Sequence, residues 1–295
     1  EDPLCQELEQ VGEFFPALKL MWKASCGLRT QREIYKGQPE KNARIDYTFV
    51  VHDDDRIEIR PRRRDAPLDL LVAEWMIFVN STWGGFLQEH KVPGIYRIQP
   101  QMGRVKMSTH AAPHVGLGVP QYAWSTSPLR RYVDLINQQQ LISVIRGQEP
   151  VYSATDADLL SAVNSFDTTY KAYAEFQSSM ERYWCLRWIQ QENRSRFEGV
   201  VVKDELVRLH EIPLFVRLVG VTSPGRGAQV EVELDQIDEL TLTVSCKLIS
   251  IQKGKPTLIF DEEEYDRESN ESQGNEVQEA TVEPDSSTQS TDSPG

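Results

Sequence analysis

The apolar pattern predicts a chain that is helical first and β-rich at its end. Apolar residues recur at helical spacing over about residues 4–31, 68–89 and 155–191, and from the Ser127-Pro128 pair to about Ile145. Pro16 is expected to kink or split the first of these helices. Short runs predict strands at 47–51, 56–60 and 94–98, and then at 197–202, 206–209, 214–219, 230–234 and 240–248. The last group is typical of a small barrel of the OB type.

These patterns predict an α+β core over residues 1–192, an OB-like β-barrel over 197–260 and an acidic tail over 261–295. The tail has twelve acidic residues and one basic residue, with almost nothing apolar, so we expect it to be disordered. The net charge of −13 is therefore concentrated there, because the rest of the chain has 31 Lys plus Arg against 33 Asp plus Glu. Net charge thus says little about partners, and the positions of the arginines matter more.

Several classes of protein are not favoured. No stretch approaches the eighteen apolar residues of a membrane span, and the opening Glu1-Asp2-Pro3 lacks the features of a secretory signal and an initiator Met. The cysteines stand far apart and the histidines lack zinc-ligand spacing, so reduced thiols in a cytoplasmic protein are the simplest interpretation. We expect a monomer that starts after its native first residue.

The most informative stretch runs from Tyr122 to Tyr132 and reads YAWSTSPLRRY. Ser127 suits a helix N-cap and Pro128 the first helical position. A helix N-terminus attracts phosphate, and Arg130 in the first turn would reach the same anion with its planar fork. The alternative is a capped surface helix in which Arg130 pairs with Asp134. The adjacent Arg130 and Arg131, which follow a Gly-rich segment in the chain, modestly favour the phosphate-binding interpretation.

This stretch resembles the signature of the RNB family, the ribonuclease II-like exoribonucleases. The resemblance rests on HVGLG from His114, on Tyr122-Ala123 and on TSPLRRYVDL from Thr126. The segment 71–80, with its Glu and Asn, and the strand 94–98 resemble the family's preceding helix and strand. The likeness covers about residues 1–192, with the barrel in the expected place beyond them.

The resemblance implies a Mg²⁺-dependent hydrolase that removes nucleotides from the 3′ end of single-stranded RNA. Arg130 would hold the scissile phosphate and stabilise its developing charge, the usual use of preorganised donors. The resemblance further implies that Tyr122, Thr126, Ser127 and Arg131 shape the floor of this site, and that Glu74 lies near the 3′ nucleotide. A helix surface carboxylate is an equal alternative for Glu74.

Three departures separate this chain from the family pattern. Residues 1–45 hold nothing like the upstream aspartate cluster that binds the metals, and Asp53-Asp54-Asp55 reads as a hairpin turn. The chain thus resembles a part lying after the metal motif, or a member that has lost it. The excursion between the strand at 94–98 and His114 is shorter than usual. Gln177 stands where the family has a catalytic glutamate, with Glu175 nearby.

Weaker features leave alternatives open. Arg104 and Lys106 would touch the RNA backbone or form a solvated face, and His110 and His114 suit loop anchors better than metal ligands. The barrel shows no stacking platform, so its RNA-binding role rests on analogy. Besides the exoribonuclease, we consider a non-catalytic RNA-binding module and an interaction protein that binds no RNA.

Overall fold

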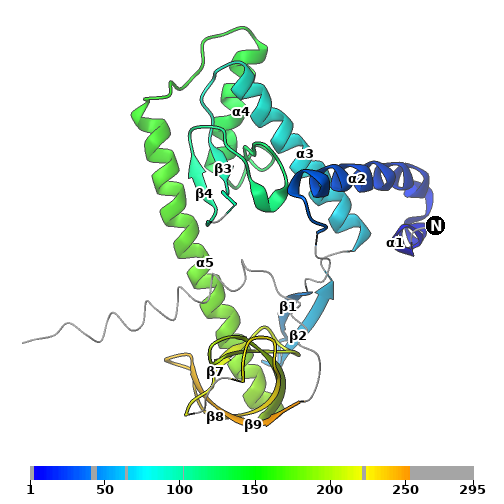
Figure 1. The fold of residues 1–295 in the computed structure, drawn as a ribbon, viewed down its shortest axis with the longest axis vertical. Helices are drawn as coiled ribbons and strands as arrows, with labels where there is room; N and C mark the ends of the chain where they lie inside the picture. The colour runs from blue at the N-terminus through cyan, green and yellow to red at the C-terminus, as the bar shows by residue number, and fades with distance from the viewer. Residues whose placement is uncertain (1–2, 41–44, 64–65, 102, 221–223, 253–295) are drawn as a thin grey trace, which may run out of the picture. The chain divides into compact units, whose positions relative to one another are not determined.

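The computed structural model describes residues 3–40, 45–63, 66–101, 103–220 and 224–252. Two compact units divide them: unit 1 holds residues up to 195 with 211–214 and 237–243, and unit 2 holds 196–210, 215–236 and the described residues from 244 onward. The expected tail at 261–295 and the end of the barrel at 253–260 lie outside the described residues. Helices dominate unit 1 and strands dominate unit 2 (Figure 1).

The N-terminal helical region is split, as the sequence predicted. It consists of α1 (Pro3–Glu7), the 3-10 helix η1 (Leu8–Phe14) and α2 (Phe15–Lys36). Gly12 interrupts the helical backbone with a φ of 65°, and Pro16 lies in the first turn of α2, where a missing N–H costs no hydrogen bond. Gly37 ends α2 in the left-handed region, and its N–H donates to the Glu33 carbonyl at 2.9 Å.

Helix α3 (Pro67–Glu89) is flanked by other helices of unit 1. It contacts α2 and α4 (Tyr132–Ile145), and α4 contacts α5 (Ala157–Glu192). By length and composition α3 could cross a membrane. However, it buries Glu74 and Asn80 within unit 1, where both make hydrogen bonds to other segments, which is the behaviour of a helix in a folded protein core.

Two small hairpins complete unit 1. β1 (Ile45–Val51) pairs antiparallel with β2 (Ile57–Arg63), and β3 (Tyr96–Ile98) pairs antiparallel with β4 (Lys106–Ser108). β2 contacts the far part of α5, where the Gln191 amide donates to the Ile57 carbonyl at 2.9 Å and accepts from its N–H at 2.7 Å. A short 3-10 helix, η2 (Val115–Leu117), lies in the irregular segment after β4.

Unit 2 is a curled antiparallel sheet consistent with an OB-like fold. Its strands are β5 (Arg196–Lys203), β6 (Leu206–Leu209), β7 (Phe215–Arg217), β8 (Gln229–Asp238) and β9 (Thr243–Ile251), in the order β7-β6-β5-β8-β9. The sheet curls so that the chain after β7 reaches β9, where the Val219 N–H donates to the Cys246 carbonyl at 3.2 Å, beside a bridge between Leu218 and Cys246. A half-barrel of this kind confirms the expected OB-like architecture.

Candidate functional site

The expected helix start at Ser127 and Pro128 is wrong. Residues 128–130 form a turn, in which the N–H groups of Arg130 and Arg131 donate to the Ser127 carbonyl at 3.2 and 3.1 Å. Arg131 is extended, with φ −133° and ψ 114°, and α4 begins only at Tyr132. An extended residue cannot continue a helix, so the motif projects as a turn in front of α4. Phosphate binding here would depend on side chains more than on a helix N-terminus.

The carboxylate of Asp134 holds this turn in place by hydrogen bonds. Its fully buried carboxylate accepts the Ser127 N–H at 2.8 Å and two N–H groups of Arg131, Nε and Nη2, each at 2.8 Å. Charge-assisted, two-pronged contacts of this kind are the strong ones. Asp134 therefore pairs with Arg131, and the alternative pair of Arg130 with Asp134 does not form. Arg130 is exposed, and its guanidinium has no ion-pair partner among the described residues.

Asn80 of α3 holds the extended segment that leads into the turn. Its side-chain oxygen accepts the Ser125 N–H at 2.9 Å, and its amide group lies 3.3 Å from both the Tyr122 hydroxyl and the Thr126 hydroxyl. Asn80 and Ser125 are fully buried. Tyr122 is also buried, so it supports the segment from inside, while Thr126 and Ser127 are half-buried at the surface.

A second buried amide, Asn137 of α4, ties the same segment to Ile95, the residue before β3. It accepts the Ile95 N–H at 2.7 Å and donates to the carbonyls of Ile95 and Trp124 at 2.8 and 2.7 Å. All of its polar atoms thus have partners inside the unit, which satisfies a buried amide and rigidifies the backbone around it. The segment is therefore held from both sides, by Asn80 and Asn137.

Trp124 lies between this framework and two arginines. Its ring is 7% exposed, and the guanidinium carbons of Arg131 and Arg97 lie over it at 4.1 and 5.0 Å from the centroid. Both distances allow cation–π attraction. Arg97, on β3, has no ion-pair partner among the described residues. Two positive charges are thus positioned beside the turn that carries Arg130.

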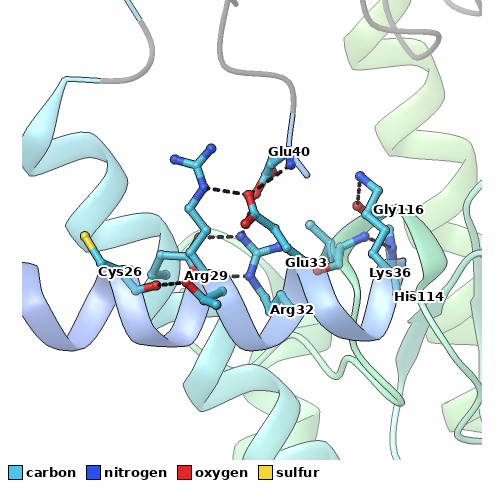
Figure 2. Close-up of polar contacts among 11 residues, drawn as sticks. Cys26, Arg29, Arg32, Glu33, Lys36, Glu40, His114 and Gly116 are labelled. Atoms are coloured by element: carbon cyan, nitrogen blue, oxygen red, sulfur yellow. Dashed lines mark hydrogen bonds and ion pairs between the residues drawn. The ribbon is translucent and has the colours of Figure 1, made fainter. Parts of the chain in front are cut away.

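Glu74 does not lie open to a ligand. Its buried carboxylate accepts Arg32 Nε at 2.9 Å and a second, shorter hydrogen bond from Arg32 Nη2. Arg32 also donates to the Leu117 carbonyl at 2.6 Å and to Glu40 at 2.8 Å. Figure 2 shows Arg32 of α2 and Glu40 from this group, together with Lys36, whose ammonium donates to the Gly116 carbonyl at 3.0 Å. The alternative of a helix surface carboxylate is therefore wrong, because Glu74 is 1% exposed. Its position near the 3′ nucleotide stays a prediction.

His114 anchors the HVGLG segment, as the sequence indicated. It is 1% exposed, and its Nδ1 accepts the Leu117 N–H at 3.2 Å. Its Nε2 has no hydrogen-bond partner among the described residues. Burial first, and then the charge of Arg97, lower the pKa of His114 to about 4. The ring is therefore neutral at pH 7.

The two remaining predicted contact residues lie on and just before β4. Arg104 and Lys106 are both exposed, and Lys106 pairs with Ile98 across the β3–β4 hairpin. β4 begins at Lys106, so Arg104 lies in the irregular segment just before it. Both charges are accessible to solvent, so either expected role is still open to them.

Comparisons with known proteins place this motif. A family model described as the RNB domain matches residues 101–147, which include the HVGLG segment and the TSPLRRY turn. An uncharacterized ribonuclease of Synechocystis is 26% identical over 178 residues, and the chloroplastic/mitochondrial ribonuclease II of Arabidopsis thaliana is 27% identical over 198 residues. The stretch that carries this turn therefore matches part of an RNB domain.

The chain spans only part of these RNB relatives. The two matches cover 52% and 56% of this chain but 26% and 24% of the respective relatives. Among solved structures, apo RNase R of Mycoplasma genitalium matches 82% of this chain and 53% of its own, at a TM-score of 0.68 and 14% identity. An exoribonuclease of Candida glabrata matches 80% and 35%, at a TM-score of 0.65 and 20% identity. These likenesses show a shared fold.

The described residues of this chain do not fit a Mg²⁺ site. Among them, no group of three or more His, Cys, Asp or Glu side chains is placed to hold a metal ion. Asp53, Asp54 and Asp55 lie exposed in the turn between β1 and β2, as a hairpin turn predicts. Glu175 is exposed on α5 and pairs with Lys171 at 3.7 Å, and Gln177 donates to Glu181 at 2.9 Å.

Sequence reasoning missed the residues that hold the site together. Asn137 and Arg32 carried no signal in the sequence, because nothing in a helical pattern indicates which polar residue faces a distant backbone. Asn80 was noticed only as part of a resemblance. The stacking of Trp124 under Arg97 and Arg131 likewise has no sequence signal, since its neighbours in the chain are Ala123 and Ser125 and the fold brings the arginines to it.

Proposed function

We propose that this chain is the phosphate-holding part of a 3′-to-5′ exoribonuclease that acts on single-stranded RNA. The observation that carries the proposal is the TSPLRR turn, which Asp134 and Asn80 hold rigidly while the Arg130 guanidinium stays exposed. The match of residues 101–147 to the RNB domain and the similarity to ribonucleases support RNA as the substrate. Since the chain covers about a quarter of those relatives' length, the activity of the whole protein is part of the proposal.

Arg130 would bind a non-bridging oxygen pair of the scissile phosphate. A guanidinium presents two parallel N–H groups that match a phosphate. Its binding strengthens when negative charge develops on the phosphate oxygens during attack by water. The fixed turn means that little reorganisation is needed at that moment. Thr126 and Ser127 supply half-buried hydroxyls beside it, and Arg131 adds positive charge while it keeps its pair with Asp134.

Tyr122 and Glu74 would act only through other residues. Tyr122 and Thr126 both accept from the Asn80 amide, so Tyr122 helps to hold the backbone segment that leads into the turn. Glu74 fixes Arg32 and thereby the HVGLG segment. Both are positioning residues in this proposal. Arg104 and Lys106 would meet the RNA backbone farther from the scissile bond.

Mg²⁺ enters this proposal through the family resemblance alone. The metal would activate water and neutralise charge when bound. The described side chains do not fit such a site, so what they contribute is binding and orientation of the phosphate. The same observation favours a second candidate, a non-catalytic RNA-binding module. We also propose a monomer and a cytoplasmic location. The four free cysteines support the location only, because free thiols are usual in a reducing compartment.

A product ladder separates these candidates. The 295-residue protein is incubated with 5′-labelled single-stranded RNA in the presence and absence of Mg²⁺. Shortening from the 3′ end supports the exoribonuclease, and binding without cleavage supports the binding module. A protein that neither cleaves nor binds the RNA contradicts both candidates. If cleavage occurs, Arg130→Ala is expected to lower turnover about a hundredfold or more and RNA affinity far less. Arg146→Ala, an exposed arginine at the other end of α4, is the matched control.

A further inference from the structure

An aromatic stripe runs along α5 away from the motif. Phe166, Tyr170 and Tyr173 follow one another at spacings of four and three residues, so they share one face of the helix. Phe166 is half-buried, Tyr170 is 46% exposed and Tyr173 is 63% exposed. The rings thus become more accessible with each step along the helix.

The stripe starts at Trp124, beside the arginines. Trp124 meets Phe166 edge-on, with ring centroids 5.7 Å apart, and Tyr170 at 6.2 Å. Phe166 and Tyr170 are stacked, with centroids 5.5 Å apart and planes 22° from parallel. Arg131, whose guanidinium covers Trp124, directly follows Arg130 in the chain. The aromatic series therefore begins one residue away from the proposed phosphate ligand.

The chemistry of this stretch indicates what would cover it. Between residues 164 and 179 there is no Leu, Ile, Val or Met, and the apolar side chains are Phe, Tyr and Ala only. Aromatic side chains are common in protein interfaces as well, so the rings alone do not identify the occupant. Exposed rings beside unpaired cations are the combination that binds single-stranded nucleic acid, because each base can stack on a ring while its phosphates meet the positive charge. Arg97 and Arg130 are such cations among the described residues.

We propose that Tyr170 and Tyr173, continued inward by Phe166 and Trp124, form a stacking platform for the bases of single-stranded RNA whose phosphate is held at Arg130. This inference rests on the proposed function and adds a base-binding surface to it. The platform reads no particular sequence, since every base has an aromatic face. Asp167 is the carboxylate beside it on the helix, and Glu175 pairs with Lys171.

The test compares RNA with a base-free strand. Binding of a fluorescein-labelled ten-nucleotide RNA to the 295-residue protein is measured by anisotropy, beside an abasic strand of the same length. Tyr170→Ala combined with Tyr173→Ala is expected to weaken RNA binding about tenfold or more and to leave binding of the abasic strand unchanged. Tyr170→Phe with Tyr173→Phe should bind RNA like the native protein, because the rings remain. Tyr35→Ala, an exposed tyrosine on α2, is the control.

The outcomes show separately whether the stacking platform fails and whether the proposed function fails. Native-like RNA binding by the double alanine variant overturns the platform and leaves the proposed function intact. An equal loss for RNA and the abasic strand also overturns it, since bases would then not be recognised. A native protein that binds no RNA at all contradicts the platform and the proposed function together. If the alanine variant instead converts a dimer to a monomer in sedimentation, the stripe is a contact between protein copies and the inference is wrong.

Discussion

Replacing Glu74 by glutamine removes the negative charge that faces Arg32 while it preserves the size of the side chain. The ion pair is nearly dry, since the side chains of Arg32 and Glu74 are 9% and 2% exposed. Glutamine can accept one of the two hydrogen bonds that Arg32 donates to Glu74, but its NH₂ group would then face a second donor. The variant therefore leaves a buried guanidinium without its main counter-charge.

The expected cost is about 3 kcal/mol of folding free energy. Removing one partner of a buried pair costs roughly 3–5 kcal/mol. The lower end applies because Arg32 keeps the Leu117 carbonyl at 2.6 Å and Glu40 at 2.8 Å, the latter partly exposed. Glu175→Gln removes an exposed i,i+4 pair with Lys171 and should cost less than about 0.5 kcal/mol.

Urea unfolding followed by tryptophan fluorescence measures the difference in folding free energy in unit 1, the unit that contains Arg32 and Glu74. All six tryptophans lie between residues 22 and 188, inside unit 1. With a slope of about 2 kcal/mol per molar urea, the midpoint of Glu74→Gln should fall by roughly 1–2 M. Adding Arg32→Met should cost less than the sum of the two single changes, because the unpaired charge is gone.

Two results would refute this reasoning. A loss below about 1 kcal/mol for Glu74→Gln would mean that the pair with Arg32 contributes little. Unchanged stability combined with weaker RNA binding would restore Glu74 as a contact residue, contrary to the geometry described above.

Three further predictions concern the frame of the motif, each measured by the same urea assay. Asp134→Asn should cost about 2 kcal/mol, because the buried acceptor loses the charge that holds Arg131; a loss under 0.5 kcal/mol would contradict this. Gly118→Ala should cost at least about 1 kcal/mol, because Gly118 has a φ of +68° and an added Cβ would overlap the Arg32 carbonyl; native-like stability would contradict the close approach. The pKa of His114 is about 4 when folded, below the usual value near 6.5, so the unfolded chain binds more protons between these values and stability falls as pH drops through that window. Between pH 7 and pH 5 the loss should be about 2 kcal/mol and should be absent in His114→Gln, and an equal loss in that variant would refute the assignment.

Much of the secondary structure could be predicted from sequence periodicity. Helices α3 and α5 and the strands of unit 2 follow local patterns of apolar residues. The structure confirms the two helices to within two residues and all five strands, although β8 and β9 end three to four residues later than predicted. The start of α4 could not be predicted in this way. Ser127 and Pro128 favour a helix locally, but Asp134 accepts the Ser127 N–H and draws in Arg131, so tertiary contacts select a turn.

The site was predictable only where the motif itself carries the chemistry. Arg130 is exposed on its turn, as a phosphate ligand must be. Glu74 shows the limit of this reasoning, because its partner Arg32 is 42 positions away and no spacing rule connects them. The supporting amides Asn80 and Asn137 likewise act on backbone groups more than ten residues distant, which only the folded structure brings together.

The salt dependence of RNA affinity in Arg130→Ala tests the central claim most directly. For a single strand, each phosphate neutralised contributes about 0.7 to the slope of log affinity against log salt concentration. If Arg130 holds a phosphate, its removal should reduce the magnitude of that slope by about 0.7, while Arg146→Ala, about 20 Å away along α4, should leave it unchanged. Identical slopes for the native protein and Arg130→Ala would contradict the account.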